Sequence, residues 1–292
     1  MTPKFALKAV CAALALAAGG TAYAGPFYLD IGTSYGPAAD QVNATSTSMK
    51  DQVTFQYQSR TTLTDVTGNG YGAGDTTATI AGLAVGPLSL NNITGFSPDQ
   101  TVAPSDSNNG YKNTWQLGFD ITGLTGTVLN SALDIGYNAG GVIHMFLWKP
   151  DSSVANFNFM NINILGGSSG TGGTLLSGEV DFTGIAANPY ANLFHSGSYT
   201  CGTSSGFFDI WTNCGGNTNA LQISFLGDFN TNIATATVTP LNAQGVAGAQ
   251  VLLAANHDGS ATFNVPEPGS LALLGLALAG LGLTQRRRKL QK

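Results

Sequence analysis

Residues 115–121, WQLGFDI, place a large apolar side chain at every second position. The tryptophan, leucine, phenylalanine and isoleucine therefore share one face of an extended strand, because successive side chains of a strand point to opposite faces. Residues 53–57, VTFQY, and residues 221–225, LQISF, repeat this alternation. The period of two predicts that the body of the chain is built from half-buried β-strands.

Further strand-like segments are bounded by turn-forming residues: 77–85, 142–148, 157–165, 175–182, 233–239, 251–255 and 261–265. No long apolar period of 3.6 residues lies between them, so the body is expected to lack a helix. Many short strands with glycine-rich turns favour an all-β fold, an antiparallel sandwich or jelly roll. The run GGSSGTGG at residues 166–173 is interpreted as a long hairpin loop and not a domain linker. We therefore expect one β domain over residues 25–264.

This predicted domain is strongly acidic. It contains fifteen acidic residues against four basic ones, which gives a net charge of −11. Phosphate backbones and anionic lipids are repelled by such a surface, so nucleic acid is excluded as a partner. Divalent cations are its expected electrostatic partners.

The N-terminal residues have the three parts of an export signal. Two lysines precede an apolar run at residues 9–18, and AYA at residues 22–24 precedes Gly25. The run is shorter than the ~20 residues that a membrane span requires. Residues 1–24 are therefore predicted to be a helical signal peptide for the Sec export machinery, cleaved between Ala24 and Gly25.

The C-terminal residues 265–292 also have three parts in a fixed order. They are a proline-rich motif, an uncharged stretch and a basic cluster: Val265, Pro266, Glu267 and Pro268, then residues 270–284, then Arg286, Arg287, Arg288 and Lys289. The apolar core at residues 271–283 would rise about 20 Å as a helix, against about 30 Å of hydrocarbon. A short transmembrane helix is expected, and the basic cluster stops transfer and keeps the C-terminus in the cytoplasm.

This tail resembles a PEP-CTERM sorting signal. The resemblance implies that an exosortase processes the chain near its motif, in a Gram-negative bacterium that makes exopolysaccharide, biofilm or flocs. The protein would be held transiently at the inner membrane and then reach the cell surface or the extracellular matrix. A plain tail anchor, in which Pro-Glu-Pro is only a linker, is the alternative.

Two cysteines remain once Cys11 is removed with the leader. Cys201 and Cys214 are predicted to form a disulfide, because the mature chain enters an oxidising compartment. A short loop rich in glycine and serine lies between them, and the crosslink would tether it.

The search for catalytic groups finds no convergent set. The three histidines are far apart and lack metal-ligand spacing: His144, His195 and His257. His144 is expected to be a core or barrel-facing residue of its apolar strand and not a metal ligand. Glu179 and Asp181 would share one strand face, an arrangement of paired carboxylates that some glycosidases use. The competing interpretation is a solvated strand face with Val180 and Phe182 inward.

Residues 65–75 are the best candidate for a cation site. Asp65, Thr67, Asn69 and Asp75 supply oxygen atoms around glycines, as in the first half of a Ca²⁺ loop. The glutamate expected at the twelfth position is missing, since Thr76 stands there. An ordinary Gly-Asn-Gly hairpin explains the same residues without a metal.

Aromatic residues in loop-like segments are candidates for gripping sugars: Tyr71, Tyr111, Tyr190, Tyr199 and Trp211. Core packing is the alternative for each of them. Residues 206–211, GFFDIW, together with residues 65–75, resemble the flocculation-associated PEP-CTERM proteins.

These observations favour a non-enzymatic surface or matrix protein of biofilm or flocs that associates with exopolysaccharide. The alternatives are a lectin-like carbohydrate-binding module and a surface glycoside hydrolase that uses Glu179 and Asp181.

Overall fold

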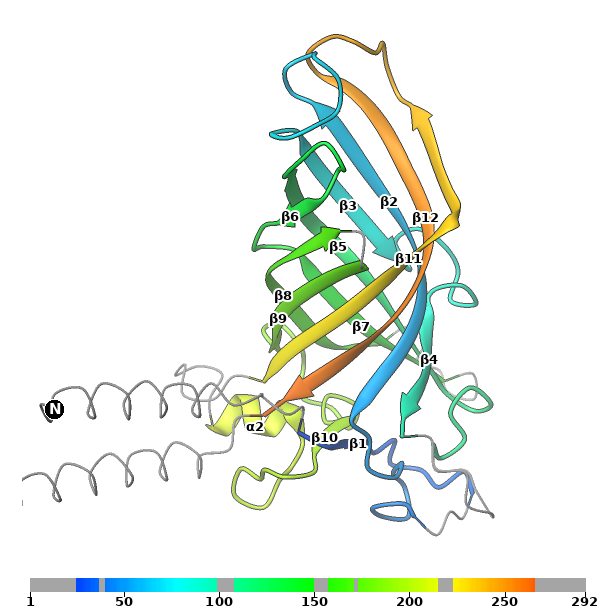
Figure 1. Cartoon of the computed structure of the whole chain (residues 1–292). Coiled ribbons are helices and arrows are strands. Elements are labelled where there is room, and N and C mark those ends of the chain that lie inside the picture. The colour runs from blue at the N-terminus through cyan, green and yellow to red at the C-terminus, as the bar shows by residue number, and fades with distance from the viewer. Residues whose placement is uncertain are drawn as a thin grey trace, which may run out of the picture. The chain divides into compact units, whose positions relative to one another are not determined.

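The structure is a computed structural model that describes residues 25–36, 40–98, 108–149, 157–170, 173–214 and 223–265 (Figure 1). These residues form antiparallel strands and one short helix, which confirms the all-β expectation. The elements are β1 (Phe27–Leu29), β2 (Gln52–Asp65), β3 (Thr76–Gly82), β4 (Asn92–Ser97), β5 (Gln116–Val128), β6 (Ile135–Tyr137), β7 (Val142–Trp148), β8 (Phe157–Gly170), β9 (Gly173–Asp181), β10 (Phe194–Ser196), α2 (Phe207–Cys214), β11 (Ser224–Pro240) and β12 (Ala249–Asn264).

The membrane-related predictions concern the two ends of the chain. The signal peptide and the C-terminal transmembrane helix both lie outside the described residues. Among the described residues, no helix has the length and apolar character to cross a membrane. Residues Ala24–Val265 form one compact unit.

The main sheet closes on itself. Its antiparallel pairings run from β2 through β3, β5, β7, β8, β9 and β11 to β12, and β12 pairs again with β2. The predicted sandwich or jelly roll of stacked sheets is therefore wrong, because one ten-stranded sheet returns to its first strand. Alternation along a strand reports that one face is buried. It does not report whether a second sheet or the same sheet covers that face.

Irregular pairing helps the sheet to curve. Register shifts occur at Thr54/Phe55 in β2 and at Ile164/Gly166 in β8, with others in β3, β7 and β11. Such bulges bend a strand and increase its local twist, which brings the first and last strands together.

Aromatic side chains fill the interior. Phe55 lies 5.4 Å from Phe119 and 4.9 Å from Phe229 between ring centroids. The cavity found among these side chains measures about 20 Å³ and has an apolar lining. That volume accommodates about one water molecule, so this cavity is too small for a sugar or any other organic ligand.

A small cap closes one end of the sheet. β1 pairs with β10, and α2 packs beside them at the lower end in Figure 1. The rings of Phe194 and Phe207 lie 5.3 and 5.9 Å from Phe263 at the end of β12. This cluster joins the cap to the closed sheet.

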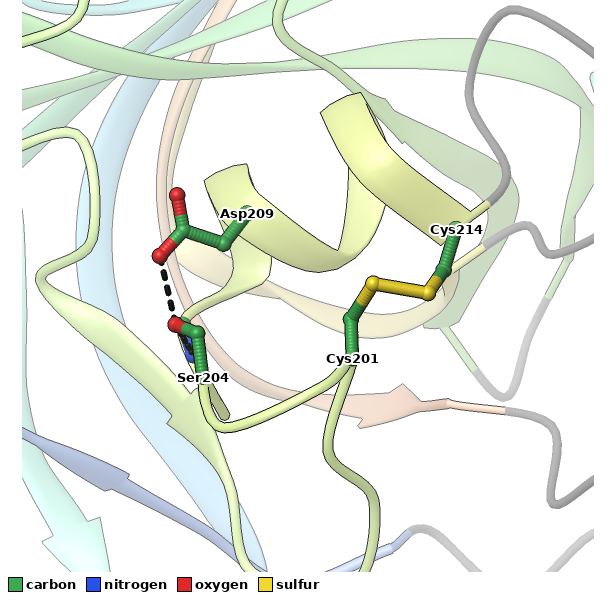
Figure 2. The surroundings of a disulfide bond; sticks show 5 residues. Cys201, Ser204, Asp209 and Cys214 are labelled. Atoms are coloured by element: carbon green, nitrogen blue, oxygen red, sulfur yellow. Dashed lines mark hydrogen bonds between the residues drawn. A yellow bond between two sulfur atoms is a disulfide. The ribbon is translucent and has the colours of Figure 1, made fainter.

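The predicted disulfide joins Cys201 to Cys214, with Cα atoms 5.9 Å apart (Figure 2). It holds the last residue of α2, a helix that the sequence did not predict. Eight residues are too short to show a helical period. Contacts from outside the helix stabilise it, since the Asn192 side chain accepts the N–H of Asp209 at 3.1 Å and Ser204 bonds the Asp209 carboxylate.

The glycine-rich run forms a tighter hairpin than expected. β8 continues to Gly170 and β9 begins at Gly173, with residues 166–170 paired against residues 173–177. The glycines therefore belong largely to strands and not to a long loop.

Candidate functional site

Glu179 and Asp181 lie on the outer face of the closed sheet. Val180 and Phe182 between and beside them are buried, as the solvated-face interpretation requires. Asp181 accepts the Asn163 side-chain amide at 2.9 Å and the N–H of Thr183 at 2.8 Å. Burial raises the pKa of Asp181, but these hydrogen bonds outweigh burial and hold that pKa below its ordinary value. Asp181 is thus suited to accept hydrogen bonds and unsuited to be a general acid.

Strand register extends this polar surface across four strands. Asp120 of β5 is opposite His144 of β7, which is opposite Asn161 of β8, which is opposite Asp181 of β9. Directly paired side chains stand about 5 Å apart, so the four residues form one row. At one end of the row, His144 Nδ1 and the Asp120 carboxylate form a hydrogen bond of 2.6 Å.

Two large aromatic residues continue the same face. Phe146 and Trp148 follow His144 at alternate positions of β7 and are half-buried, whereas the intervening Met145 and Leu147 point into the core. The rings of His144 and Phe146 lie 6.4 Å apart. An apolar platform therefore stands directly beside the polar row.

Asparagines of β8 supply amide groups between the platform and the carboxylates. Asn158 donates from Nδ2 to the Asn161 side-chain oxygen at 2.9 Å, and Asn163 donates to Asp181. The Oδ1 atom of Asn158 is buried and has no hydrogen-bond partner among the described residues. Amides and carboxylates together offer both donors and acceptors.

We call this surface the polar–aromatic face. Its members are Asp120, His144, Phe146, Trp148, Asn158, Asn161, Asn163, Glu179 and Asp181. Sequence reasoning found only the two carboxylates of β9 and expected His144 in the core, yet 30% of the His144 side chain is exposed. The sequence did contain a signal for this face. His144, Phe146 and Trp148 alternate with the buried residues of the strand, so they must point to its other side.

The histidines do not converge on one site. His195 Nδ1 lies 3.1 Å from the Ser205 hydroxyl in the cap, and His257 Nε2 lies 2.6 Å from the Ser59 hydroxyl on the inner face of the sheet. The ring of His257 also stacks on Tyr57 at 4.5 Å. Burial lowers the pKa of His257 to about 4, which keeps the imidazole neutral at pH 7.

The structure brings the predicted calcium ligands Asp65 and Asp75 into one loop, but backbone groups occupy their oxygens. Asp65 accepts the N–H groups of Thr67, Gly68 and Gly70 at 2.6–3.1 Å. Asp75 accepts the N–H groups of residues 66 and 72 at 2.9 and 2.8 Å. These contacts explain the loop as a capped turn, so the calcium hypothesis gains no support from its geometry.

Burial raises the pKa of Asp65, but backbone donors from residues 67–70, the Asn69 N–H among them, outweigh burial and hold the pKa below its ordinary value. The carboxylate is therefore ionised because the loop itself stabilises it.

The predicted sugar-binding aromatics do not gather on one surface. Tyr111 is buried and donates its hydroxyl to the Ile93 carbonyl at 2.7 Å. Trp211 packs on Phe182, and Tyr199 packs against the core. Tyr190 lies under the Lys149 ammonium, 5.9 Å from the ring centroid, and Tyr71 bonds Gln244.

The two predicted processing sites begin at neighbouring points of the fold. Gly25 lies beside Asn264 and Val265, and Val265 is buried in the core. Ala24, the rest of the motif and the basic cluster lie outside the described residues. The folded body therefore extends to the residue that precedes Pro266.

Comparison with known families identifies the tail. The model of the PEP-CTERM protein-sorting motif matches residues 264–288, which include Val265–Pro268 and Arg286–Arg288. No curated protein matches the chain. The chain thus carries a PEP-CTERM sorting motif, which implies export, anchoring in the membrane and processing by an exosortase. The motif covers the tail and leaves the activity of the β body open.

Proposed function

We propose that the mature body is a non-enzymatic matrix protein that binds exopolysaccharide through its polar–aromatic face. In this proposal the exosortase delivers it to the surface or extracellular matrix of a Gram-negative bacterium, where it promotes biofilm or floc cohesion. The sorting motif supports the route. The observation that carries the binding function is the alignment of Trp148 and Phe146 of β7 beside the amides and carboxylates of β5, β8 and β9.

The chemistry of this face suits a sugar chain. A pyranose ring has an apolar face that packs on aromatic rings, and its hydroxyl groups donate and accept hydrogen bonds. Phe146 and Trp148 provide the rings for packing. Asn161, Asn163 and Asp181 provide the hydrogen-bonding groups. A strand surface is open along its length, so it fits internal units of a long polymer as well as its end.

Charge limits the kind of polymer. The face carries three carboxylates, on Asp120, Glu179 and Asp181, within a domain of net charge −11. A polyuronate would meet like charge, whereas a neutral or amino-bearing polysaccharide would not. Binding of amino sugars should weaken as salt rises.

The test uses the exported protein and exopolysaccharide purified from the producing strain. Trp148→Ala should weaken saturable binding about tenfold, the effect of losing roughly 1.4 kcal/mol. Leu226→Ala is the matched control, because Leu226 is 52% exposed on the outer face of β11 and outside the polar–aromatic face. Equal binding by wild type and Trp148→Ala would contradict the proposal.

A second test addresses the cell. Deleting the gene should impair flocculation or matrix retention of the polymer without stopping its synthesis. Complementation with Trp148→Ala should restore export but not cohesion. Normal flocculation in the deletion strain would refute the matrix role.

The glycoside hydrolase alternative requires a protonated carboxyl group near neutral pH. The lowered pKa of Asp181 argues against Asp181 as that acid. Turnover of a glycan that is lost in Glu179→Gln would establish the hydrolase instead.

A further inference from the structure

Among the described residues, the end of β11 at residues 237–240 has a free edge. β9 pairs with β11 only from Ser224 to Phe229, whereas β11 continues to Pro240. Beyond an irregularity between Asn232 and Thr237, β11 pairs only with β12 among the residues that the structure describes. Figure 1 shows this upper part beside β12 and away from β9.

Alternation identifies the backbone groups on that edge. The N–H of Leu241 donates to the Gln250 carbonyl at 2.9 Å, so Thr239 and Thr237 also face β12. Val238 therefore turns its N–H and C=O groups to the other side. The backbone of Pro240 also faces away from β12. The N–H that proline lacks would therefore not have bonded to β12.

The edge lacks the charges that usually protect such strands. Residues 229–257 contain no Asp, Glu, Lys or Arg, although the domain as a whole has a net charge of −11. Val238 is 65% exposed, and Leu241 and Val246 near it are also exposed. Natural proteins commonly place lysine on a free edge to prevent pairing with another chain.

We propose that the free edge of β11 pairs antiparallel with the same edge of a second copy of this chain. An antiparallel pair of identical strands is self-complementary about a two-fold axis, so one edge satisfies the other. Charge favours this occupant, because the uncharged edge of the second copy avoids the repulsion that two acidic surfaces would meet. The resulting dimer would carry two polar–aromatic faces and could hold two polymer segments.

The experiment measures the mass of the exported, processed protein by sedimentation equilibrium over a range of concentrations. The wild type should be a dimer. Val238→Lys should weaken dimerisation at least about tenfold, because like charges would face each other across the new pairing. Leu226→Lys is the matched control on the same strand, where both edges are paired, and it should remain dimeric.

Val238→Pro provides a second variant. This substitution removes a backbone N–H that points to the partner chain and leaves every hydrogen bond to β12 in place. The circular dichroism spectrum should therefore match that of the wild type, while the measured mass should fall to that of a monomer. A monomeric wild type, dimeric Val238 variants, or equal dissociation by Val238→Lys and Leu226→Lys would each overturn the proposal. This dimer does not depend on polysaccharide binding, so its failure leaves that function intact.

Discussion

The two faces of β7 share one backbone but differ in burial and in side-chain chemistry. Ile143, Met145 and Leu147 point inward and are buried, while His144, Phe146 and Trp148 point outward and are half-buried. The inner residues must fit the aromatic core, which restricts them to apolar shapes. The outer residues have no such restriction, so chemistry that contributes little to folding can collect there. We therefore expect substitutions on the inner face to change stability and those on the outer face to change binding.

The largest contrast should come from two phenylalanines. Phe119→Ala removes a buried ring whose centroid lies 5.4 Å from that of Phe55 and 5.6 Å from that of Tyr57. The substitution should lower the free energy of unfolding by about 3–5 kcal/mol. Phe146→Ala on the outer face should cost roughly 1 kcal/mol or less, because its ring is only half-buried. Urea denaturation measures both. Equal losses would show that the outer aromatic ring is part of the core.

Histidines on the two faces provide the next contrast. The unfolded state protonates His257 near pH 6.5, but the folded state does so only near pH 4. The unfolded chain therefore binds more protons between these values, and stability should fall as pH drops through this window, by up to about 3 kcal/mol. Burial also lowers the pKa of His195, which adds loss in the same direction.

His257→Gln should flatten the pH dependence of the unfolding free energy between pH 6.5 and 4. His144→Gln serves as the control, because His144 lies on the outer face and bonds Asp120. An unchanged slope in His257→Gln would mean that other groups dominate acid unfolding.

The smallest effect concerns charge on the outer face. Glu179→Gln should reduce affinity for an amino-bearing polysaccharide about two- to threefold at low salt, the effect of an exposed charge worth well under 1 kcal/mol. Affinity for a neutral polymer should not change. Isothermal titration at two salt concentrations separates the cases, and equal loss for both polymers would indicate that Glu179 acts as a hydrogen-bond acceptor.

Local signals in the sequence predicted several features correctly. Alternation located the strands around residues 53–57 and 115–121, and the oxidising compartment predicted the Cys201–Cys214 bond. The order of proline motif, apolar stretch and basic cluster predicted the sorting tail that the family model matches. Each of these depends on residues close together in the chain or on their simple count.

Other features depended on which strands became neighbours. Closure of β12 on β2, the row from Asp120 to Asp181 and the free edge of β11 all join or separate residues that are distant in sequence. Helix α2 likewise needs Asn192 and the disulfide. The sequence by itself determined the main strands, their buried sides and the sorting motif of the tail, because period and motif are local. Only the tertiary structure decided which strands are neighbours and which residues lie opposite one another, because strand partners and register are set by the packing of the whole sheet.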